Sequence, residues 1–314
     1  MTILVTGASG FVGRRLVKAL RRRLGPEAQL IGWDHSAEGS DGIERHAVDL
    51  TNAAAVTAAV RATPPKLIFH LAAISSVGQS QGAARATHEV NVTGTLNLAE
   101  ALRAHAPGAR LVFASSGEVY GAAFSSGAAL DETSPARPLN PYARSKLAAE
   151  YMLQDRLSDV CPVIALRLLN HIGPGQDERF VVPGFAAQIA RIEKGLIPPK
   201  LMVGNLAAER DFVDVDDVID AYLATLTSGD GEPGFTVYNV ASGQPRSIRS
   251  ILDRLIALST ARFDVEPDPA RLRPSEIART LSDASAFRQR TGWQPKRDLD
   301  GTLSQILDWW RERI

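Results

Sequence analysis

Three glycines at a regular spacing near the start of the chain constrain its fold more than any other feature. Gly7, Gly10 and Gly13 follow a short apolar run at residues 2–5 and open a segment, residues 11–24, with apolar side chains at helical spacing. Glycines in this pattern allow a tight turn and bring the main chain close to a pyrophosphate, which meets free N–H groups at the start of a helix. The sequence therefore predicts a strand, a phosphate-binding loop and a helix, the opening unit of a dinucleotide-binding fold.

Short apolar runs alternate with longer helix-like segments through the rest of the first half. Further strands are expected at 29–33, 45–48, 66–71, 110–114, 162–167 and 235–240, and further helices at 83–105 and 142–157. Strands that alternate with helices predict right-handed crossovers and a parallel sheet. Continuously apolar strands predict helices on both faces of that sheet. We therefore expect an α/β fold with a doubly wound parallel sheet of the Rossmann type.

A change of composition after about Leu168 indicates a second, smaller lobe. Pro and Gly become frequent there, and residues 244–314 have the pattern of small helices and loops that end in an amphipathic helix. Because the run at 235–240 is expected to return to the sheet, this C-terminal lobe should be discontinuous. The expected division assigns residues 1–167 and 208–241 to a dinucleotide-binding domain, and residues 168–207 and 242–314 to a substrate-binding domain.

Charge and cysteine content exclude several classes of protein. Lys plus Arg and Asp plus Glu number 35 each, so no net field favours nucleic acid or an acidic membrane surface. The single cysteine, Cys161, can form neither an intrachain disulfide nor a zinc cluster, and its apolar surroundings predict a packed thiol. No metal site is expected. Because the sequence shows no membrane-spanning run and no signal peptide, we expect a cytoplasmic protein without membrane or nucleic-acid partners.

An acidic residue, Asp34, closes the second expected strand, where a carboxylate can accept hydrogen bonds from the hydroxyls of an adenosine ribose. The same carboxylate would repel a 2′-phosphate, and the next residues, His35 and Ser36, supply no arginine to hold one. The sequence therefore favours NAD(H) over NADP(H), although Asp34 could instead cap a turn. Asp49 and Leu50 close the third strand, and Asp49 could contact adenine or cap the following helix.

Tyr142 and Lys146 have the Y-x-x-x-K spacing at the start of an expected helix, so their side chains share one helical face. A nearby cation lowers the pKa of a phenol, so Lys146 would make Tyr142 usable as an acid or base near neutral pH. The pattern is common by itself, but here it follows a glycine loop and a strand that leads into Ser116-Gly117-Glu118. Ser116 could hydrogen-bond a substrate carbonyl, or could be an ordinary turn serine.

Together these motifs resemble the extended short-chain dehydrogenases, the NAD-dependent epimerase/dehydratase family, over nearly the whole chain. The segments that carry the resemblance are the glycine loop, His70-Leu71-Ala72-Ala73, Asn91-Val92-Thr93-Gly94-Thr95, residues 115–121, the Tyr142/Lys146 pair and Arg210-Asp211-Phe212-Val213-Asp214-Val215. The resemblance implies a triad of Ser116, Tyr142 and Lys146, and a homodimer formed through helices 83–105 and 142–157. It also implies cofactor contacts at Gly7, Ser9, Gly10, Phe11, Val12, Gly13, Asp34, His35, Asp49, Leu50, Leu71, Ala72, Ala73, Tyr142, Lys146 and Leu169.

Within this family, the second half is most similar to enzymes of GDP-deoxyhexose metabolism, the GDP-6-deoxy-4-keto-mannose reductases more than the GDP-mannose 4,6-dehydratases. The similar segments are residues 167–176, 204–211 and 268–276. The similarity implies that a nucleotide-diphosphate sugar, GDP-linked, is bound by Ser116, Asn170, Val181, Asn205, Arg210, Arg273 and Glu276. Arginine forks suit a diphosphate, and a carboxylate suits a ribose diol. The alternatives are that Arg210 pairs with Asp211 or Asp214, and that Arg271, Arg273 and Glu276 form a surface ion-pair cluster.

Gly117 is the residue that distinguishes the expected reductase from a dehydratase. The dehydratases that resemble this chain have Thr-Asp-Glu or Thr-Ser-Glu where this chain has Ser116-Gly117-Glu118, so an acid that protonates a departing hydroxyl is less evident here. We expect reduction of a GDP-4-keto-6-deoxyhexose at C4, with Ser116, Glu118, Tyr142 and Lys146 as the catalytic set. The alternatives are a dehydratase or epimerase that retains its NAD, and a non-catalytic nucleotide-sensing module, which the intact triad disfavours.

Overall fold

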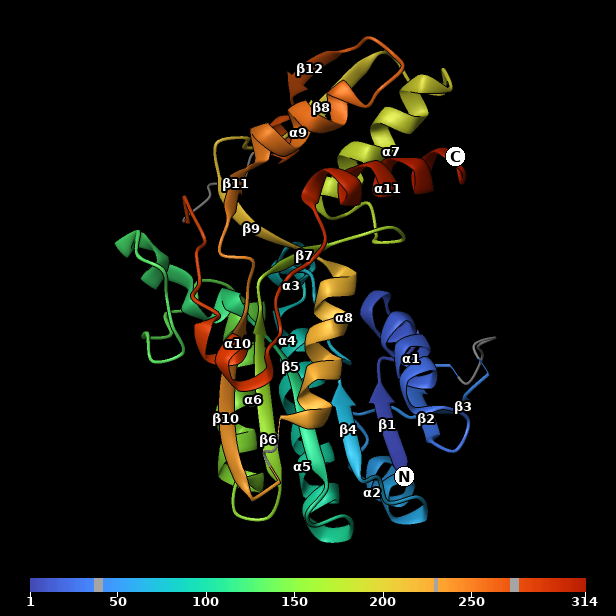
Figure 1. Cartoon of the computed structure of the whole chain (residues 1–314), viewed down its shortest axis with the longest axis vertical. Helices are drawn as coiled ribbons and strands as arrows, with labels where there is room; N and C mark the ends of the chain where they lie inside the picture. Colours follow the sequence, from blue (N-terminus) through green and yellow to red (C-terminus); the bar gives the residue numbers. More distant parts are fainter. Residues whose placement is uncertain (37–41, 229–230, 272–276) are drawn as a thin grey trace.

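A seven-stranded parallel sheet forms the centre of the molecule (Figure 1). The computed structural model describes residues 1–36, 42–228, 231–271 and 277–314. The strand order is β10-β6-β5-β4-β1-β2-β3, with bounds β1 (Thr2–Thr6), β2 (Gln29–Asp34), β3 (Glu44–Ala47), β4 (Leu67–His70), β5 (Arg110–Ser116), β6 (Pro162–Leu168) and β10 (Gly234–Val240). The order reverses beside β1, and ligands of such sheets bind at this switch point, outside the carboxyl ends of the strands. The expected doubly wound α/β fold is confirmed.

Helices cover both faces of the sheet (Figure 1), as its apolar strands require. One face carries α1 (Phe11–Leu24) and α8 (Val215–Ala224), and the other carries α2 (Ala53–Ala62), α5 (Gly94–His105) and α6 (Pro141–Leu157). Alternate residues of β1 supply the two cores, because successive side chains of a strand point to opposite faces. Ile3 and Val5 pack in the core of α1 and α8, whereas Leu4 packs in the core of α2, α5 and α6.

The segment expected as one helix at 83–105 is interrupted in the structure. It consists of α4 (Ala84–His88), a π-helical turn η1 (Glu89–Thr93) and α5, and it follows the short α3 (Val77–Gly82). Asn91 lies in the π turn. Its side chain accepts from the nitrogen of Ile74 at 2.8 Å and donates to the hydroxyl of Ser145 in α6 at 2.9 Å. Single π turns are frequent at functional sites, and this one ties the loop after β4 to the helix that carries Tyr142.

A second, smaller core lies beyond the carboxyl ends of the strands, at the top of Figure 1. Its elements are β7 (Asn170–Ile172), α7 (Val181–Glu193), β8 (Lys200–Val203), β9 (Glu209–Asp214), β11 (Pro245–Ser247), α9 (Ile248–Ala257), β12 (Asp264–Pro267) and α11 (Leu299–Arg311). Strands β7, β9 and β11 form one small sheet, and β8 pairs with β12. Leucine and isoleucine side chains of α7, α9 and α11 pack together, separate from the two cores of the main sheet.

The last part of the chain returns to the main sheet before it ends in α11. Helix α10 (Ser285–Thr291) packs against β10, and its Phe287 joins Trp293 in the core of α1 and α8. The indole nitrogen of Trp293 donates to the carbonyl of Asp217 in α8 at 2.9 Å. The remaining short helical turns are η2 (Gly117–Ser126), η3 (Thr225–Thr227) and η4 (Pro269–Arg271). The chain therefore passes repeatedly between the main sheet and the second core.

Cys161 is fully buried, as expected of a packed thiol. Burial raises the pKa of this thiol, which keeps it protonated at neutral pH. None of the helices in the described part of the chain combines the length and the apolar character that a bilayer crossing requires.

Candidate active site

A cleft of about 1880 Å³ lies along the carboxyl ends of the central strands and continues along the segment from β7 to α7. The glycine loop after β1, the ends of β2, β4 and β5, and the start of α6 all contribute to its walls. Every residue that the sequence assigned to the cofactor lines this cleft: Gly7, Ser9, Gly10, Phe11, Val12, Gly13, Asp34, His35, Asp49, Leu50, Leu71, Ala72, Ala73, Tyr142, Lys146 and Leu169. Ser116, Glu118, Asn170 and Val181 line the same cleft.

Close packing within the glycine loop explains its spacing. A Cβ atom at Gly13 would lie 2.1 Å from the carbonyl oxygen of Gly7, and one at Gly7, whose φ is +68°, would lie 2.9 Å from the nitrogen of Ala72. Gly10 is the N-cap residue of helix α1 and supplies no side-chain cap, so the first N–H groups of the helix are left for a ligand. These N–H groups, at the positive end of the helix dipole and beside the cleft, fit the pyrophosphate of a dinucleotide.

Asp34 is held between the glycine loop and the neighbouring strand. Its Oδ1 accepts from the nitrogen and the hydroxyl of Ser9 at 2.9 and 2.8 Å, and its Oδ2 pairs with the guanidinium of Arg45 in β3. These bonds cross between separate elements, so Asp34 does not cap a turn. The sequence did not reveal Arg45 as a partner of Asp34, because it lies eleven residues further along the chain than Asp34. The parallel pairing of β2 with β3 brings the two residues together.

The sequence left open whether Asp49 contacts adenine or caps the helix that follows it, and the observed cap of α2 decides between the two. Asn52 caps this helix, and its side chain accepts from the nitrogen of Ala55. Asp49 instead accepts from the nitrogen and the hydroxyl of Thr51 at 2.9 and 2.7 Å. The prediction that Asp49 caps the helix is therefore wrong, and Asp49 stays a candidate contact for adenine at the edge of the cleft.

Tyr142 and Ser116 meet at the carboxyl end of β5. Asn140 caps α6 by accepting a main-chain N–H at 2.8 Å, and a proline occupies the first helical position, so the helix begins one residue before Tyr142. Burial raises the pKa of Tyr142 to about 12, a hydrogen bond with Ser116 opposes this rise, and the nearby Glu118 carboxylate adds to it. The phenol therefore keeps its proton at neutral pH and can act as an acid toward a group bound beside Ser116.

Lys146 does not lower the pKa of Tyr142 below its ordinary value in this structure, contrary to the expectation from the sequence. Its ammonium nitrogen donates to the carbonyl of Ala114 at 2.7 Å and lies 4.8 Å from the centre of the Phe113 ring. Burial lowers the pKa of Lys146 to about 7, while the charge of Glu150 opposes the change. The same burial that raises the pKa of the phenol thus leaves its neighbouring lysine only partly charged at neutral pH.

A buried ion pair lies behind these catalytic candidates. Glu150, one helical turn after Lys146, accepts from Nε and Nη2 of Arg167 at 3.1 and 2.7 Å, and also from the hydroxyl of Ser115. The Glu150 and Arg167 side chains are only 3% and 8% exposed. Arg167 also lies over the ring of Tyr120, 4.9 Å from its centre. Sequence reasoning missed this pair because no local pattern indicates that β6 presents Arg167 to α6.

Arg210 of β9 lies near Glu118, although it is not among the described residues that line the cleft. Burial lowers the pKa of Arg210, and the charge of Glu118 raises it. The alternative acidic partners have other hydrogen bonds. Asp211 accepts from the hydroxyl of Ser242 and from two main-chain N–H groups, and Asp214 accepts from the hydroxyl of Thr302 at 2.6 Å.

Asn205, another residue expected to hold the nucleotide, does not line the cleft. Asn205 is exposed, and its side chain accepts from the nitrogen of Ala207 at 2.9 Å. The structure therefore does not place Asn205 among the lining residues. Arg273 and Glu276 lie outside the described residues. Arg271 lines the cleft and pairs with Asp268 at 3.1 Å.

Residues of the second lobe line the cleft without any signal in the sequence. Trp309 and Trp310 of α11 lie on it, together with Gln176 and Gln188. Within the described ranges, Nε1 of Trp310 and Oε1 of Gln176 are buried polar atoms with no hydrogen-bond partner. Buried polar atoms are normally paired, so a ligand in the cleft is one way to satisfy them.

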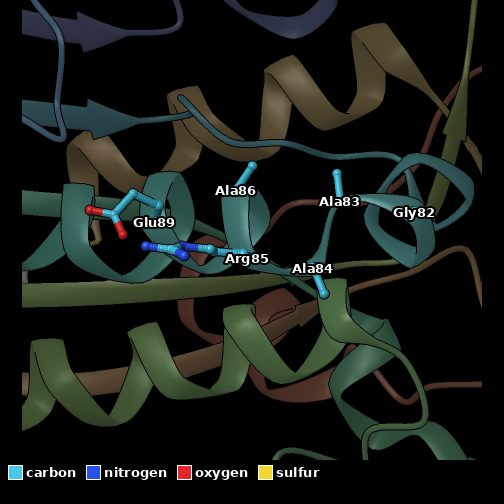
Figure 2. Close-up of a pocket in the computed structure, with 6 residues that line it drawn as sticks. All are labelled: Gly82, Ala83, Ala84, Arg85, Ala86 and Glu89. Carbon is cyan, nitrogen blue, oxygen red and sulfur yellow. The ribbon is translucent and has the colours of Figure 1, made fainter.

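A second hollow, between α3 and α4, offers no comparable chemistry (Figure 2). Its lining consists of Gly82, Ala83, Ala84, Arg85, Ala86 and Glu89. Figure 2 shows the side chains of Arg85 and Glu89 extending toward each other, while the alanines present only methyl groups. The hollow lacks a hydroxyl, a phenol or a glycine loop, so the large cleft is the candidate active site.

Comparison with known proteins agrees with this geometry. The family model for the NAD dependent epimerase/dehydratase family matches residues 3–241. The chain belongs to this family. Membership confirms the resemblance found in the sequence and makes the protein an NAD(P)-dependent enzyme.

Members of the family with different reactions are similar to this chain over its whole length. The GDP-6-deoxy-D-mannose reductase of Pseudomonas aeruginosa is 35% identical over 314 residues, which cover 99% of this chain and 98% of that protein. A solved structure of RMD from Pseudomonas aeruginosa complexed with NADPH is 33% identical, with a TM-score of 0.86, and the match covers 100% of this chain and 99% of that one. The UDP-glucose 4-epimerase of Thermus thermophilus, solved with NAD, is 32% identical, with a TM-score of 0.86 and complete coverage of both chains.

Proposed function

We propose that this protein reduces the C4 carbonyl of a GDP-linked 4-keto-6-deoxyhexose with NAD(P)H. The observation that carries the proposal is that the Tyr142–Ser116 pair shares one cleft with the glycine loop and Asp34. A protonated phenol beside a cofactor loop is the arrangement that carbonyl reduction requires. The similarity to the Pseudomonas aeruginosa reductase over the whole chain supports the choice of substrate class.

The two lobes would divide the binding of the two substrates. We assign the cofactor mainly to residues 1–167 and 208–241, and the sugar nucleotide mainly to residues 168–207 and 242–314, although β9 pairs within the second lobe and α10 packs on the main sheet. The N–H groups at the start of α1 would hold the pyrophosphate, Asp34 the adenosine ribose, and Lys146 the nicotinamide ribose. When bound, NAD(P)H supplies the hydride that reduces the sugar carbonyl.

The residues of this chain would supply the proton and fix the geometry. The Ser116 hydroxyl donates to the carbonyl oxygen of the sugar, and Tyr142 gives that oxygen its proton as negative charge develops there. Both donors are positioned before the reaction, and such preorganised donors account for much of enzymatic rate enhancement. Glu118, held by the amide of Asn140 at 3.3 Å, would orient the hydroxyls of the sugar.

The surroundings of Gly117 favour reduction over dehydration. A Cβ atom at Gly117 would lie 3.0 Å from both terminal methyl carbons of Leu169. The Asp or Ser side chain found at this place in similar dehydratases would therefore displace Leu169. An epimerase that retains its NAD is the second candidate, because the Thermus thermophilus structure with NAD matches this chain over its full length.

We propose that NAD(H) binds in preference to NADP(H), because the Asp34 carboxylate lies at the end of β2 and lines the cleft. A carboxylate at this place accepts from a ribose diol and opposes a 2′-phosphate. Because the Pseudomonas aeruginosa relative was solved with NADPH, we expect the preference of this protein for NAD(H) over NADP(H) to be modest.

A direct assay tests the proposed reaction. The purified protein is mixed with GDP-4-keto-6-deoxymannose and NADH, and cofactor oxidation is followed together with the sugar product. Reduction of this substrate, with little turnover of UDP- or dTDP-linked 4-keto sugars, supports the proposal. Interconversion of UDP-glucose and UDP-galactose without added cofactor would instead establish the epimerase.

We further propose a homodimer through α5 and α6. The two helices pack side by side on one face of the sheet, and the ring of Tyr151 in α6 is 58% exposed. Size-exclusion chromatography with light scattering measures the molecular mass of the assembly. A dimer that dissociates in Tyr151→Glu supports this interface, and a monomeric wild type contradicts it.

A further inference from the structure

The side chain of Arg45 crosses from β3 to the end of β2, where it pairs with Asp34; Asp34 lines the cleft, and Arg45 lies behind it. Strands β2 and β3 are parallel, with Gly32 opposite Arg45 and Asp34 opposite Ala47. Gly32 has no side chain, and a Cβ atom there would lie 3.5 Å from Cγ of Arg45. The stem of Arg45 therefore passes over Gly32, and its guanidinium arrives beside Asp34, at the end of the strand.

The Asp34 carboxylate has little hydrogen-bonding capacity left. Ser9 supplies two donors to Oδ1, and Arg45 pairs with Oδ2. An ionised carboxylate has about four acceptor positions, so roughly one remains for a ribose hydroxyl. The Arg45 and Asp34 side chains are 4% and 5% exposed, which means that water screens the pair weakly and its two charges largely cancel.

We propose that Arg45 is the residue that determines specificity at the 2′-position of the adenosine ribose. Its guanidinium can bind a 2′-phosphate, but it is paired with Asp34 when that phosphate is absent. While the pair is intact, the carboxylate accepts from the ribose and the unphosphorylated cofactor is preferred. A 2′-phosphate would compete with Asp34 for the same guanidinium, and the planar fork of arginine suits either anion. The charge of Arg45 thus limits the penalty that Asp34 imposes on a phosphorylated cofactor.

This inference rests on the proposed place of the adenosine ribose at Asp34, but not on the sugar that the enzyme reduces. It is therefore tested by binding alone. Calorimetry measures the Kd of NAD⁺ and NADP⁺ for the wild type, Asp34→Asn, Arg45→Met and the double variant. Adenosine 5′-monophosphate and adenosine 2′,5′-bisphosphate serve as fragment probes that isolate the phosphate.

The four proteins should show coupling between the two residues. Asp34→Asn should lower the ratio of the NADP⁺ to the NAD⁺ dissociation constant by about tenfold or more, the worth of one charged hydrogen bond. Arg45→Met should raise the ratio, and the gain from Asp34→Asn should be smaller in the double variant, where only the loss of the carboxylate's repulsion remains. Arg22→Met, which removes an exposed charge from the last turn of α1, should leave the ratio unchanged.

One outcome overturns the proposal directly. If Asp34→Asn improves NADP⁺ binding equally with and without Arg45, Arg45 does not hold the phosphate; Arg14, which lines the cleft and donates to the carbonyl of Ser9 at 2.7 Å, would then be the next cation to test. If Arg45→Met unfolds, Arg45→Lys replaces it, and thermal unfolding monitors folding in every variant. A lysine keeps the charge but not the fork, so the Asp34→Asn gain should persist in reduced form. If Asp34→Asn gives the full gain in NADP⁺ binding in the Arg45→Lys background, the charge at position 45 is what holds the phosphate. If it gives no gain in that background, the proposal is contradicted.

Discussion

The ammonium nitrogen of Lys146 donates to the main-chain carbonyl of Ala114 at 2.7 Å. This bond fixes the lysine against β5, the strand that ends in Ser116. Because burial also lowers the pKa of Lys146 to about 7, its charge is present below neutral pH and is lost as the pH rises through that value. Protonation of Lys146 is therefore a titration near neutral pH within the candidate active site.

Carbonyl reduction should slow as the pH rises through about 7. The charged ammonium favours release of the Tyr142 proton, and this help disappears when Lys146 becomes neutral. A pH profile of kcat/KM for the reduction measures the effect. In Lys146→Met the activity should be low, and the fall near pH 7 should be absent. A wild-type profile that is flat across this region would contradict the assignment.

Tyr142→Phe should lose about 10²–10⁴-fold in kcat, the usual worth of general acid catalysis. The variant keeps the ring, so packing at the start of α6 should survive while the proton donor is gone. Steady-state kinetics measure the loss, and an unchanged melting temperature shows that the fold is intact. Activity close to that of the wild type would assign the proton to another group.

Glu118→Gln should keep most of the reductase activity, because the amide still makes hydrogen bonds to a sugar hydroxyl. A dehydratase would instead need the carboxylate to remove a proton from carbon. Both reactions are assayed on the same protein, with GDP-4-keto-6-deoxymannose and NADH in one case and GDP-mannose without reductant in the other. Strong conversion of GDP-mannose by the wild type, lost in Glu118→Gln, would replace the reductase assignment with a dehydratase.

Breaking the buried pair of Glu150 and Arg167 should destabilise the protein by about 3–5 kcal/mol, because one charge then remains buried without its partner. Denaturant unfolding of Arg167→Met and Glu150→Gln measures the cost, provided the transition is two-state. The double variant should lose less than the sum of the single losses. Additive losses would mean that the two residues stabilise the fold independently.

Gly13→Ala should abolish measurable cofactor binding and lower the melting temperature, because the added methyl carbon would lie 2.1 Å from the carbonyl oxygen of Gly7. Calorimetry with NAD⁺ gives the affinity. Gly82→Ala is the matched control, since a Cβ atom there meets nothing within 4 Å. Normal binding by Gly13→Ala would show that the loop adjusts without harm.

Local patterns in the sequence predicted the main sheet well, because its central strands are continuously apolar and its first helix is amphipathic. The helix expected at 83–105 was only partly right. The π turn at Glu89–Thr93 depends on the contact of Asn91 with Ile74 and Ser145, which no periodicity reveals. The strands of the second lobe were missed for a similar reason, since β7 and β11 have only three residues each and β9 is rich in charged residues, so the three strands depend on pairing with one another.

At the candidate site, the motifs were brought together as expected, but two ion pairs between separate elements were not foreseen. The glycine loop, Ser116 and the Tyr142/Lys146 pair all line the cleft. The partner of Asp34 was missed because Arg45 reaches it only through the register of two parallel strands. The pKa of Tyr142 was predicted in the wrong direction because the sequence shows the cation but not the burial that outweighs it.

The alternation of the chain between the two cores has a consequence for synthesis. Helix α11 supplies Leu303, Ile306 and Leu307 to the second core and places Trp309 and Trp310 on the cleft. Shortly before it, Phe287 and Trp293 complete the core of the main sheet. Neither core is therefore complete until the chain has been synthesised through these segments, and a fragment that stops before Phe287 would carry two incomplete cores.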